Sequence, residues 1–283
     1  MNIQEINYKS NSYPELLRDI SSPPKKLFCL GQIPDLPMVA IVGSRKPSKY
    51  GEQITHQLAY DLASAGMCVV SGLAYGIDAI AHRAALEAGG KVVAVLGTPL
   101  DTIYPAANRN LAKKILGCGG AVLSEYEVGT NTQRFNFPAR NRIIAGLSLA
   151  TIITEANAQS GSLITANFAI TNDRLVMAVP GNLTSPRSAG PNNLIKLGAK
   201  LITGATDVLA ELELKSSILQ VKKIAPASKE EAIVAELIAA GHNNTHTMIE
   251  NSEFDAARLA HVLSLMEITG KIRNLGAGQW IMN

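Results

Sequence analysis

The feature that most constrains the fold is an alternation of short apolar runs with helical patterns that begins at Met38. The runs are rich in β-branched residues, and they read MVAIVG, MCVVSG, KVVAVLG, AVLSE, ATIITEA and LVMAVPG. Between the first two runs, Ile54, Leu58 and Leu62 recur at helical spacing, and Gly66 is typical of the left-handed residue that ends a helix. Buried strands joined by crossover helices predict an α/β fold, a Rossmann-like, open, mostly parallel sheet with helices on both faces.

The length of the chain predicts a second, smaller domain. Its 283 residues exceed the roughly 200 that one α/β domain of this kind needs. We expect an N-terminal strap over 1–37, a Rossmann-like domain over 38–213, a linker over 214–227 and a winged-helix-like domain over 228–283. The last domain is predicted from helical patterns over 230–240, 245–250 and 255–268, followed by a hairpin over 271–281.

Charge is unevenly distributed between these two domains. From Ser228 to the end there are four Lys or Arg against seven Asp or Glu, a net charge of −3, whereas the preceding part has 22 against 16, a net charge of +6. The total of +3 does not identify a nucleic-acid binder, because electrostatic recognition depends on where the charge lies. The positive charge belongs to the larger segment, which precedes Ser228.

Several classes of protein do not fit the sequence. Residues 1–12 lack the basic start and apolar stretch of a signal peptide, and no apolar run reaches the roughly 18 residues of a membrane span. The cysteines Cys29, Cys68 and Cys118 are scattered and form no C-x-x-C pair. We therefore expect a cytoplasmic protein without membrane contact, disulfide framework or zinc site.

Almost every predicted strand ends in small or polar residues. The ends read Gly43-Ser44-Arg45, Ser71-Gly72, Gly97-Thr98, Ser124-Glu125, Glu155 with Ser160-Gly161-Ser162 after it, and Pro180-Gly181-Asn182. In an open parallel sheet these positions line one crevice, where backbone amides and helix N-termini can meet an anion. The pattern predicts a phosphate-binding edge.

The first of these ends, Gly43-Ser44-Arg45, combines three useful groups. The glycine permits close approach of the chain, the hydroxyl can donate a hydrogen bond, and the guanidinium can bind phosphate oxygens through two N–H groups. The alternative is a tight turn followed by an exposed arginine, which the motif alone does not exclude.

A second cluster, FNFPARNR over 135–142, places aromatic rings beside Arg140 and Arg142. Aromatic and cationic groups together form a platform for the bases and phosphates of an unpaired strand. The alternative is that the phenylalanines lie in the core while the arginines pair with carboxylates such as Glu125 or Glu155.

Two weaker signals have structural explanations. The serines around Gly161 would create an anion site at a helix start, although capping of the helix alone explains them. Asp78 and His82 lie four residues apart on one helix face, and a structural pairing is favoured over a metal site because no third ligand is evident.

No motif indicates catalysis. There is no G-x-x-x-x-G-K-[ST] loop, no G-x-G-x-x-G after the first strand and no G-x-S-x-G nucleophile elbow. We therefore predict a binding protein rather than an enzyme, with no cofactor and no metal.

Taken together, the segments AIVGSRKPSKYG, VVSGLAYGIDAIAH, VAVLGTPLDTIYPAAN, FPARNRIIAGLS, EANAQSGSLITA and AVPGN resemble the DNA-processing protein A (DprA, also called Smf) family. The resemblance runs from Tyr13 to about Glu213, and the tail is similar to the winged-helix module that often ends these proteins. It implies a protein that binds incoming single-stranded DNA during natural transformation, protects it and helps to load the RecA recombinase. It also implies a homodimer, and a DNA pocket around Arg45, Arg140 and Arg142.

The strand-end motifs and the family resemblance predict the same interface for the DNA backbone, and Arg109 and Lys196 are predicted as further cations in it. The residues predicted to bind single-stranded DNA are Gly43, Ser44, Arg45, Ser71, Gly72, Arg109, Phe137, Arg140, Asn141, Arg142, Ser160, Gly161, Ser162 and Lys196. The sequence differs from many members of the family in two respects. Only twelve residues precede Tyr13, where many members carry a helical domain, and the C-terminal module is acidic, which disfavours strong phosphate binding.

Two other functions remain open at this point. One is a nucleotide-processing enzyme of the lysine-decarboxylase-like group, such as a phosphoribohydrolase, whose PGGxGTxxE motif is replaced here by EANAQSGSLIT. The other is a regulator in which the winged helix acts while the crevice senses a small ligand, and the acidic tail disfavours it.

Overall fold

A computed structural model describes residues 3–212, 228–240, 242–269, 271–276 and 278–282. The chain divides into two compact units, Met1–Val221 and Lys222–Asn283. The linker expected over 214–227 lies outside the described residues. No helix within the described ranges is both long enough and apolar enough to cross a membrane.

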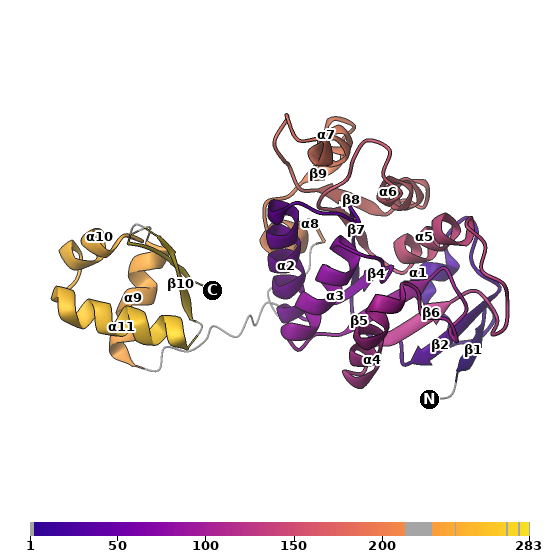
Figure 1. Cartoon of the computed structure of the whole chain (residues 1–283), viewed down its shortest axis with the longest axis horizontal. Coiled ribbons are helices and arrows are strands. Elements are labelled where there is room, and N and C mark those ends of the chain that lie inside the picture. The colour runs from indigo at the N-terminus through magenta and orange to yellow at the C-terminus, as the bar shows by residue number, and fades with distance from the viewer. Residues whose placement is uncertain (1–2, 213–227, 241, 270, 277, 283) are drawn as a thin grey trace. The chain divides into compact units, whose positions relative to one another are not determined.

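The larger unit is built on a nine-stranded sheet with the order β1-β2-β6-β5-β4-β3-β7-β8-β9 (Figure 1). Its strands are β1 (Gln4–Asn7), β2 (Lys26–Gly31), β3 (Met38–Val42), β4 (Cys68–Ser71), β5 (Val92–Leu96), β6 (Ala121–Ser124), β7 (Ala150–Ile153), β8 (Leu175–Ala178) and β9 (Lys200–Leu201). The pairings from β6 through β9 are all parallel, whereas β2 pairs antiparallel with both β1 and β6 at one edge. The sheet is therefore open and mostly parallel, as predicted.

Helices cover both faces of this sheet (Figure 1). They are α1 (Glu15–Arg18), α2 (Lys49–Ser64), α3 (Ile77–Glu87), α4 (Arg109–Gly117), α5 (Asn136–Gly146), α6 (Ser162–Thr171), α7 (Ala189–Lys196) and α8 (Ala205–Glu211). One core cluster joins α2, α3, α4 and α8 to the sheet through side chains that include Leu58 and Ile115. A second joins α1, α5, α6 and α7 to the opposite face through side chains that include Leu17 and Ile143.

Burial on both faces explains the apolar runs in the sequence. Within β3, Val39 and Ile41 belong to the first cluster, whereas Ala40 and Val42 belong to the second, because successive strand residues point to opposite faces. All six predicted strands are present as β3 to β8. Gly66 has the left-handed conformation expected of it, with φ of +86°, and it follows the end of α2.

The edges of the sheet differ from the prediction. The segment expected to be a strap contributes β1 and β2, and a further strand, β9, pairs with β8 through only two residues. Strand β2 has three buried residues, but the two outermost strands lack the apolar-run signal, since β1 has one buried residue and both residues of β9 are exposed. Pairing with a neighbouring strand, rather than burial, defines them.

The order of the strands fixes the location of a crevice. From β3 the chain moves outward through β4, β5 and β6, and it then returns to the other side of β3 with β7, β8 and β9. The connections after β3 and β7 therefore diverge to opposite faces of the sheet. In doubly wound sheets, ligands bind in the crevice at the carboxyl ends of the strands at such a switch point.

The smaller unit contains three helices and a hairpin. These are α9 (Lys229–Ala239), α10 (Thr245–Glu250), α11 (Ala256–Ile268), β10 (Ile272–Gly276) and β11 (Gln279–Met282). Each helix follows a residue whose side chain accepts a hydrogen bond from the first turn, namely Ser228, Asn244 and Asp255. Its core includes Met248 and Trp280. The order of elements is the one the sequence predicts.

Candidate functional site

A cavity of about 830 Å³ lies at the switch point of the larger unit. Its lining comes from the loop after β3, the first half of α5, the loop before α6 and the start of α6 itself. The residues are Val42 to Arg45, Ala74, Asp78, Phe137, Pro138, Arg140, Asn141, Ile144, Asn157 to Ser162, Ile164, Thr165, Pro186 and Ala189. Nine predicted site residues therefore line one cavity together: Gly43, Ser44, Arg45, Phe137, Arg140, Asn141, Ser160, Gly161 and Ser162.

The loop that carries Arg45 is held rigidly from both sides. The backbone N–H of Ser44 donates to the carbonyl of Glu155 at 2.7 Å, and the carbonyl of Ser44 accepts from the backbone N–H of Ile77 at 3.1 Å. A Cβ on Gly43 would lie 2.6 Å from the carbonyl oxygen of Glu155, so only glycine permits this approach. The Arg45 side chain is exposed and extends from this fixed support.

The start of α2, the first helix after β3, is occupied by a carboxylate of the chain itself. Glu155 is buried, and its side-chain oxygens accept from the backbone N–H of Ser48 at 2.8 Å and from the Ser48 hydroxyl at 2.5 Å. Ser48 is also the N-cap of α2, where its hydroxyl accepts from Gly51 N–H. A carboxylate is favoured at a helix N-terminus, and here it fills the place where dinucleotide-binding proteins hold a pyrophosphate.

The start of α6, in contrast, opens into the cavity. Gly161 at the N-cap makes no side-chain capping hydrogen bond, and the hydroxyls of Ser160 and Ser162 lie 2.8 Å apart. Asn141 on α5 donates to the carbonyl of Gly161 at 3.2 Å and so ties this loop to the neighbouring helix.

The backbone N–H groups of the first turn of α6 already have partners in the chain. Ser162 N–H donates to Oγ of Ser160 at 3.4 Å, as the capping explanation predicts, and the N–H groups of Leu163 and Ile164 donate to carbonyls of the same loop at 3.1 and 3.2 Å. What this loop can offer a ligand in the cavity is therefore chiefly its two serine hydroxyls.

Arg140 forms part of the cavity wall but is not available as a surface cation. It is 5% exposed, and its Nη1 donates to the carbonyls of Gly72, at 2.7 Å, and of Val95. Its pKa is lowered to about 10, chiefly by burial; the charge of Asp78 opposes this shift, and the charge of Arg45 contributes to it. Arg140 therefore stays charged at neutral pH, and it supplies positive potential from behind the surface.

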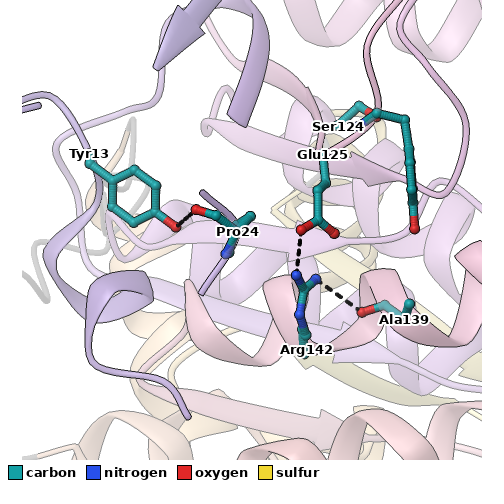
Figure 2. A network of polar contacts seen from close by, with 7 residues as sticks. Tyr13, Pro24, Ser124, Glu125, Ala139 and Arg142 are labelled. Carbon is teal, nitrogen blue, oxygen red and sulfur yellow. Dashed lines mark hydrogen bonds and ion pairs between the residues drawn. The ribbon is translucent and has the colours of Figure 1, made fainter. Parts of the chain in front are cut away.

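Arg142 is engaged with a carboxylate (Figure 2). Its Nη2 lies 2.6 Å from Oε1 of Glu125, which follows β6, and its Nη1 donates to the carbonyl of Ala139 at 3.4 Å. The two charged side chains are 13% and 26% exposed. For Arg142, the structure therefore has the pairing with Glu125 that the sequence analysis left open as the alternative.

The two phenylalanines of this segment have different surroundings. Phe137 is half-buried, lines the cavity and packs against Tyr104, with ring centroids 5.3 Å apart. Phe135 is 67% exposed, so neither ring is part of the fully buried core. Phe137 also lines a small pocket of about 100 Å³ with Tyr75, Tyr104 and Arg45. An aromatic surface therefore adjoins the exposed guanidinium.

The other predicted site residues do not line the cavity. Ser71 is buried and donates to the carbonyl of Ile41 at 2.7 Å, and a Cβ on Gly72 would lie 2.7 Å from the guanidinium carbon of Arg140. Gly72 therefore leaves room for Arg140, and its carbonyl accepts a hydrogen bond from that side chain. Arg109 at the start of α4 and Lys196 at the end of α7 are exposed at other places on the surface.

Asp78, which lines the cavity, and His82 are both buried, but they do not pair with each other. Asp78 accepts hydrogen bonds from the backbone N–H groups of Gly72 and Ala74, at 3.0 and 3.4 Å. Neither ring nitrogen of His82 makes a hydrogen bond of normal geometry with a described residue. The pKa of His82 is lowered to about 3, chiefly by burial, with a contribution from the charges of Arg140 and Arg83. The described residues contain no metal-binding group of three or more His, Cys, Asp or Glu side chains.

The sequence analysis missed three groups of this site. Tyr75 and Tyr104 lie in the small pocket beside Arg45, and Asn157 lines the main cavity. All three lie on connections that leave the carboxyl ends of β4, β5 and β7. The strand-end rule that selected Arg45 would have found them if it had been extended a few residues further along each loop.

The fold and the cavity define a class: a doubly wound α/β protein with a crevice at its switch point that Arg45 lines, and with a small helical module later in the chain. The family model for DNA recombination-mediator protein A matches residues 4–213. The chain belongs to this family, which includes the DprA and Smf proteins.

Relatives within the family cover the larger unit. DNA processing protein DprA of Streptococcus pneumoniae is 47% identical over 203 residues, which are 71% of this chain and 71% of that protein. Protein Smf of Synechocystis is 44% identical over 217 residues, which are 75% of this chain and 54% of that protein. This chain thus spans about half the length of the Synechocystis relative.

Solved structures show the same fold. The X-ray structure of DprA from Streptococcus pneumoniae superposes with a TM-score of 0.71 at 44% identity and covers 76% of each chain. DNA processing protein A from Helicobacter pylori, described for its single-stranded DNA binding mode, gives a TM-score of 0.67 at 34% identity and covers 75% of this chain and 96% of that one. Membership of the family supports a role in DNA processing and recombination.

Proposed function

We propose that the larger unit binds single-stranded DNA in the cavity, mainly through the sugar-phosphate backbone, and that it catalyses no reaction. One observation carries the proposal: the exposed Arg45, on a loop held by backbone hydrogen bonds, lines one cavity together with Phe137 and the hydroxyl-bearing loop before α6. A cation, hydroxyl donors and an aromatic ring are groups that bind the backbone and bases of an unpaired strand. The Helicobacter pylori relative, with its single-stranded DNA binding mode, supports the proposal.

The residues divide into those that would contact DNA and those that would hold them. The proposed contacts are Arg45, the hydroxyls of Ser160 and Ser162, and Phe137. Arg140 and Asn141 are proposed as supports, because Arg140 donates to carbonyls of the sheet and Asn141 donates to Gly161. Arg142 is a weak candidate for direct contact, since Glu125 neutralises it.

The test compares single-stranded and duplex oligonucleotides of the same sequence across a salt series. Contacts to phosphates predict preference for the single strand and a fall of the logarithm of affinity with the logarithm of salt, by about 0.7 per phosphate contacted. Equal affinity for the duplex, or affinity that does not depend on salt, would refute the backbone mechanism.

The homodimer implied by the family resemblance is part of the proposal. Strand β9 is an edge strand with both residues exposed, and Leu197, just before it, is 85% exposed. An exposed edge next to an apolar side chain supports association with a second copy. Replacing Leu197 with Glu should convert the dimer to a monomer in light scattering, and an unchanged dimer would place the interface elsewhere.

For the smaller unit we propose a winged-helix module that contacts protein rather than DNA. In such modules the second helix of the pair enters the DNA groove. Here the corresponding helix, α11, has Arg258 paired with Glu230, and the unit as a whole is acidic. Deletion from Ser228 onward should leave single-strand affinity unchanged, and loss of binding would show that the module contacts the DNA.

The cellular role follows from the family resemblance: protection of incoming single-stranded DNA during natural transformation, in the cytoplasm, and help in loading RecA. A strand-exchange assay checks the last step. On DNA coated with a single-strand-binding protein, the chain should shorten the lag before RecA-dependent exchange, and an unchanged lag would count against recombinase loading.

A further inference from the structure

A second hollow of about 790 Å³ lies between α2 and α3, on the other side of Arg45. Its floor and walls come from the segment before α2, the first turns of α2, the start of α3 and the outer face of α3. The residues that matter for binding are Arg45, Lys46, Tyr75, His56, Arg83 and Glu87. Arg45 lines both this hollow and the cavity at the switch point.

The free charge of this hollow is positive. Two carboxylates reach it. Glu52 forms an ion pair with Lys49, at 2.9 Å from Nζ, and Glu87 lies 2.7 Å from Nε2 of His56, a contact that is an ion pair only when the histidine is protonated. Even with the charge of Glu87 counted, the cations of the hollow are in excess. The side chains of Lys46 and Arg83 are exposed and have no ion pair or hydrogen bond with any residue that the structure describes. With Arg45 they give three unpaired cations on one surface.

The hollow is continuous with the proposed DNA site. The small pocket of about 100 Å³ shares Phe137 and Arg140 with the cavity, and it shares Tyr75 and Arg45 with the hollow. Tyr75 is 50% exposed, so its ring is available on the path between the two. A chain of hollows with a cation at each step and an aromatic ring between them fits one extended polyanion with flat bases.

The backbone segments that carry Tyr75 and Arg45 are packed tightly against each other. Gly76 has φ of +73°, and a Cβ at this position would lie 2.7 Å from the carbonyl carbon of Arg45. The backbone that carries Tyr75 is therefore packed directly against the backbone that carries Arg45. Lys46 is fixed next to them, because its carbonyl accepts from Nε of Arg187 at 2.9 Å.

We propose that this hollow is a second binding site for the same single strand. The strand leaves the cavity past Arg45, a base stacks on Tyr75, and the following phosphates are bound by Lys46 and Arg83. This inference rests on the proposed function, and it extends the DNA footprint of one chain beyond the cavity at the switch point.

The experiment measures affinity against oligonucleotide length. Fluorescence anisotropy with oligothymidylates from about 3 to about 20 nucleotides covers the range of single-strand site sizes. The variant is the double substitution Lys46→Ala with Arg83→Ala. The matched control is Lys113→Ala with Lys114→Ala, which removes the same charge from exposed positions on α4 that line neither hollow.

The proposal predicts a difference that depends on length. The shortest oligonucleotides should bind the double variant as they bind the unsubstituted chain, whereas long ones should lose affinity, and the salt slope for long ones should fall by about 1.4 because two phosphate contacts are gone. Tyr75→Ala should weaken only long oligonucleotides, by about tenfold. The control should keep the original slope.

Two results would overturn the inference. One is an unchanged salt slope for long oligonucleotides in the double variant, and the other is an equal loss at every length, which would assign the two cations to the first cavity. Failure of the proposed function is a separate outcome, because the unsubstituted chain would then bind no oligonucleotide of any length. Melting curves show that each variant is folded.

Discussion

Arg45 and Arg142 each belong to one of the two predicted cationic motifs, yet one is exposed and the other is paired with a carboxylate. Arg142 lies 2.6 Å from Glu125, and little of either side chain is exposed. Arg45 is exposed although the buried carboxylate of Glu155 is close to its loop, since both oxygens of that carboxylate are used by Ser48. The comparison teaches that a cation at a strand end is free for a ligand only when the neighbouring acids already have partners.

The largest expected effect concerns Arg140, which differs from both because it is buried. Arg140→Leu should lower the free energy of unfolding by about 3–5 kcal/mol, because the carbonyls of Gly72 and Val95 lose their donor and buried Asp78 loses an opposing charge. Urea denaturation of the variant measures the loss. Arg45→Ala is the matched control and should change stability by less than about 0.5 kcal/mol. A loss below 1 kcal/mol for Arg140→Leu would mean that this arginine does not hold the wall together.

Buried His82 should make the free energy of unfolding fall as the pH is lowered. The pKa of His82 is lowered to about 3 by burial and by nearby arginines, from 6.5 in an unfolded chain. Between these values the unfolded state binds a proton that the folded state excludes, so stability falls as the pH is lowered. The fall due to His82 is about 1.36 kcal/mol per pH unit, or about 2.7 kcal/mol from pH 6 to pH 4.

The measurement is the difference between the unsubstituted chain and His82→Leu. Carboxylates titrate in part of the same range, and the difference between the two chains isolates the histidine. The variant should lose less stability on acidification. Identical slopes in the two chains would contradict the low pKa.

The third effect concerns the free arginine itself. Arg45→Ala should weaken binding of single-stranded DNA by about thirtyfold, since a charge-assisted contact to phosphate contributes about 2 kcal/mol. Arg45→Lys should recover part of the affinity, because it restores the charge without the paired N–H donors. An oligonucleotide titration at moderate salt checks both variants. Affinity within twofold of the original for Arg45→Ala would remove this residue from the proposed interface.

The smallest effect is expected for Arg142. Arg142→Ala should change DNA affinity by less than about twofold and should lower stability by about 1 kcal/mol, since its charge is balanced by Glu125. A double-mutant cycle with Glu125→Ala measures the coupling in both properties. If Arg142→Ala weakens DNA binding as much as Arg45→Ala does, the contrast between the two arginines is wrong.

Most of the sheet could be predicted because its strands are buried on both faces. The runs that became β3 to β8 carry this information locally, and the helices of the smaller unit carry it in their capping residues and spacing. The edge strands could not be predicted in this way. Lys200 and Leu201 of β9 are exposed, and only the hydrogen bonds to β8 make them a strand.

The sequence predicted most of the residues that line the cavity, but it did not predict which of the arginines are free. Strand-end positions brought Arg45 and the serines around Gly161 to one cavity. Whether each arginine is free depends on partners far away in the sequence: Arg140 is bound to carbonyls 68 and 45 residues away, and Ser48 is 107 residues from Glu155. Glu125 was one of two carboxylates considered as partners of the second arginine cluster, and only tertiary structure selects it.

The carboxylate at the start of α2 also has a consequence for selectivity among metabolites. A tethered group competes at an effective concentration set by the chain, in the millimolar range for short tethers, and it is never diluted or depleted. Free nucleotides therefore meet an internal competitor at the helix terminus that related folds offer to them. If the chain binds DNA as proposed, a ligand binds tightly only when it makes several separated contacts at once, which a polymer can do and a mononucleotide cannot.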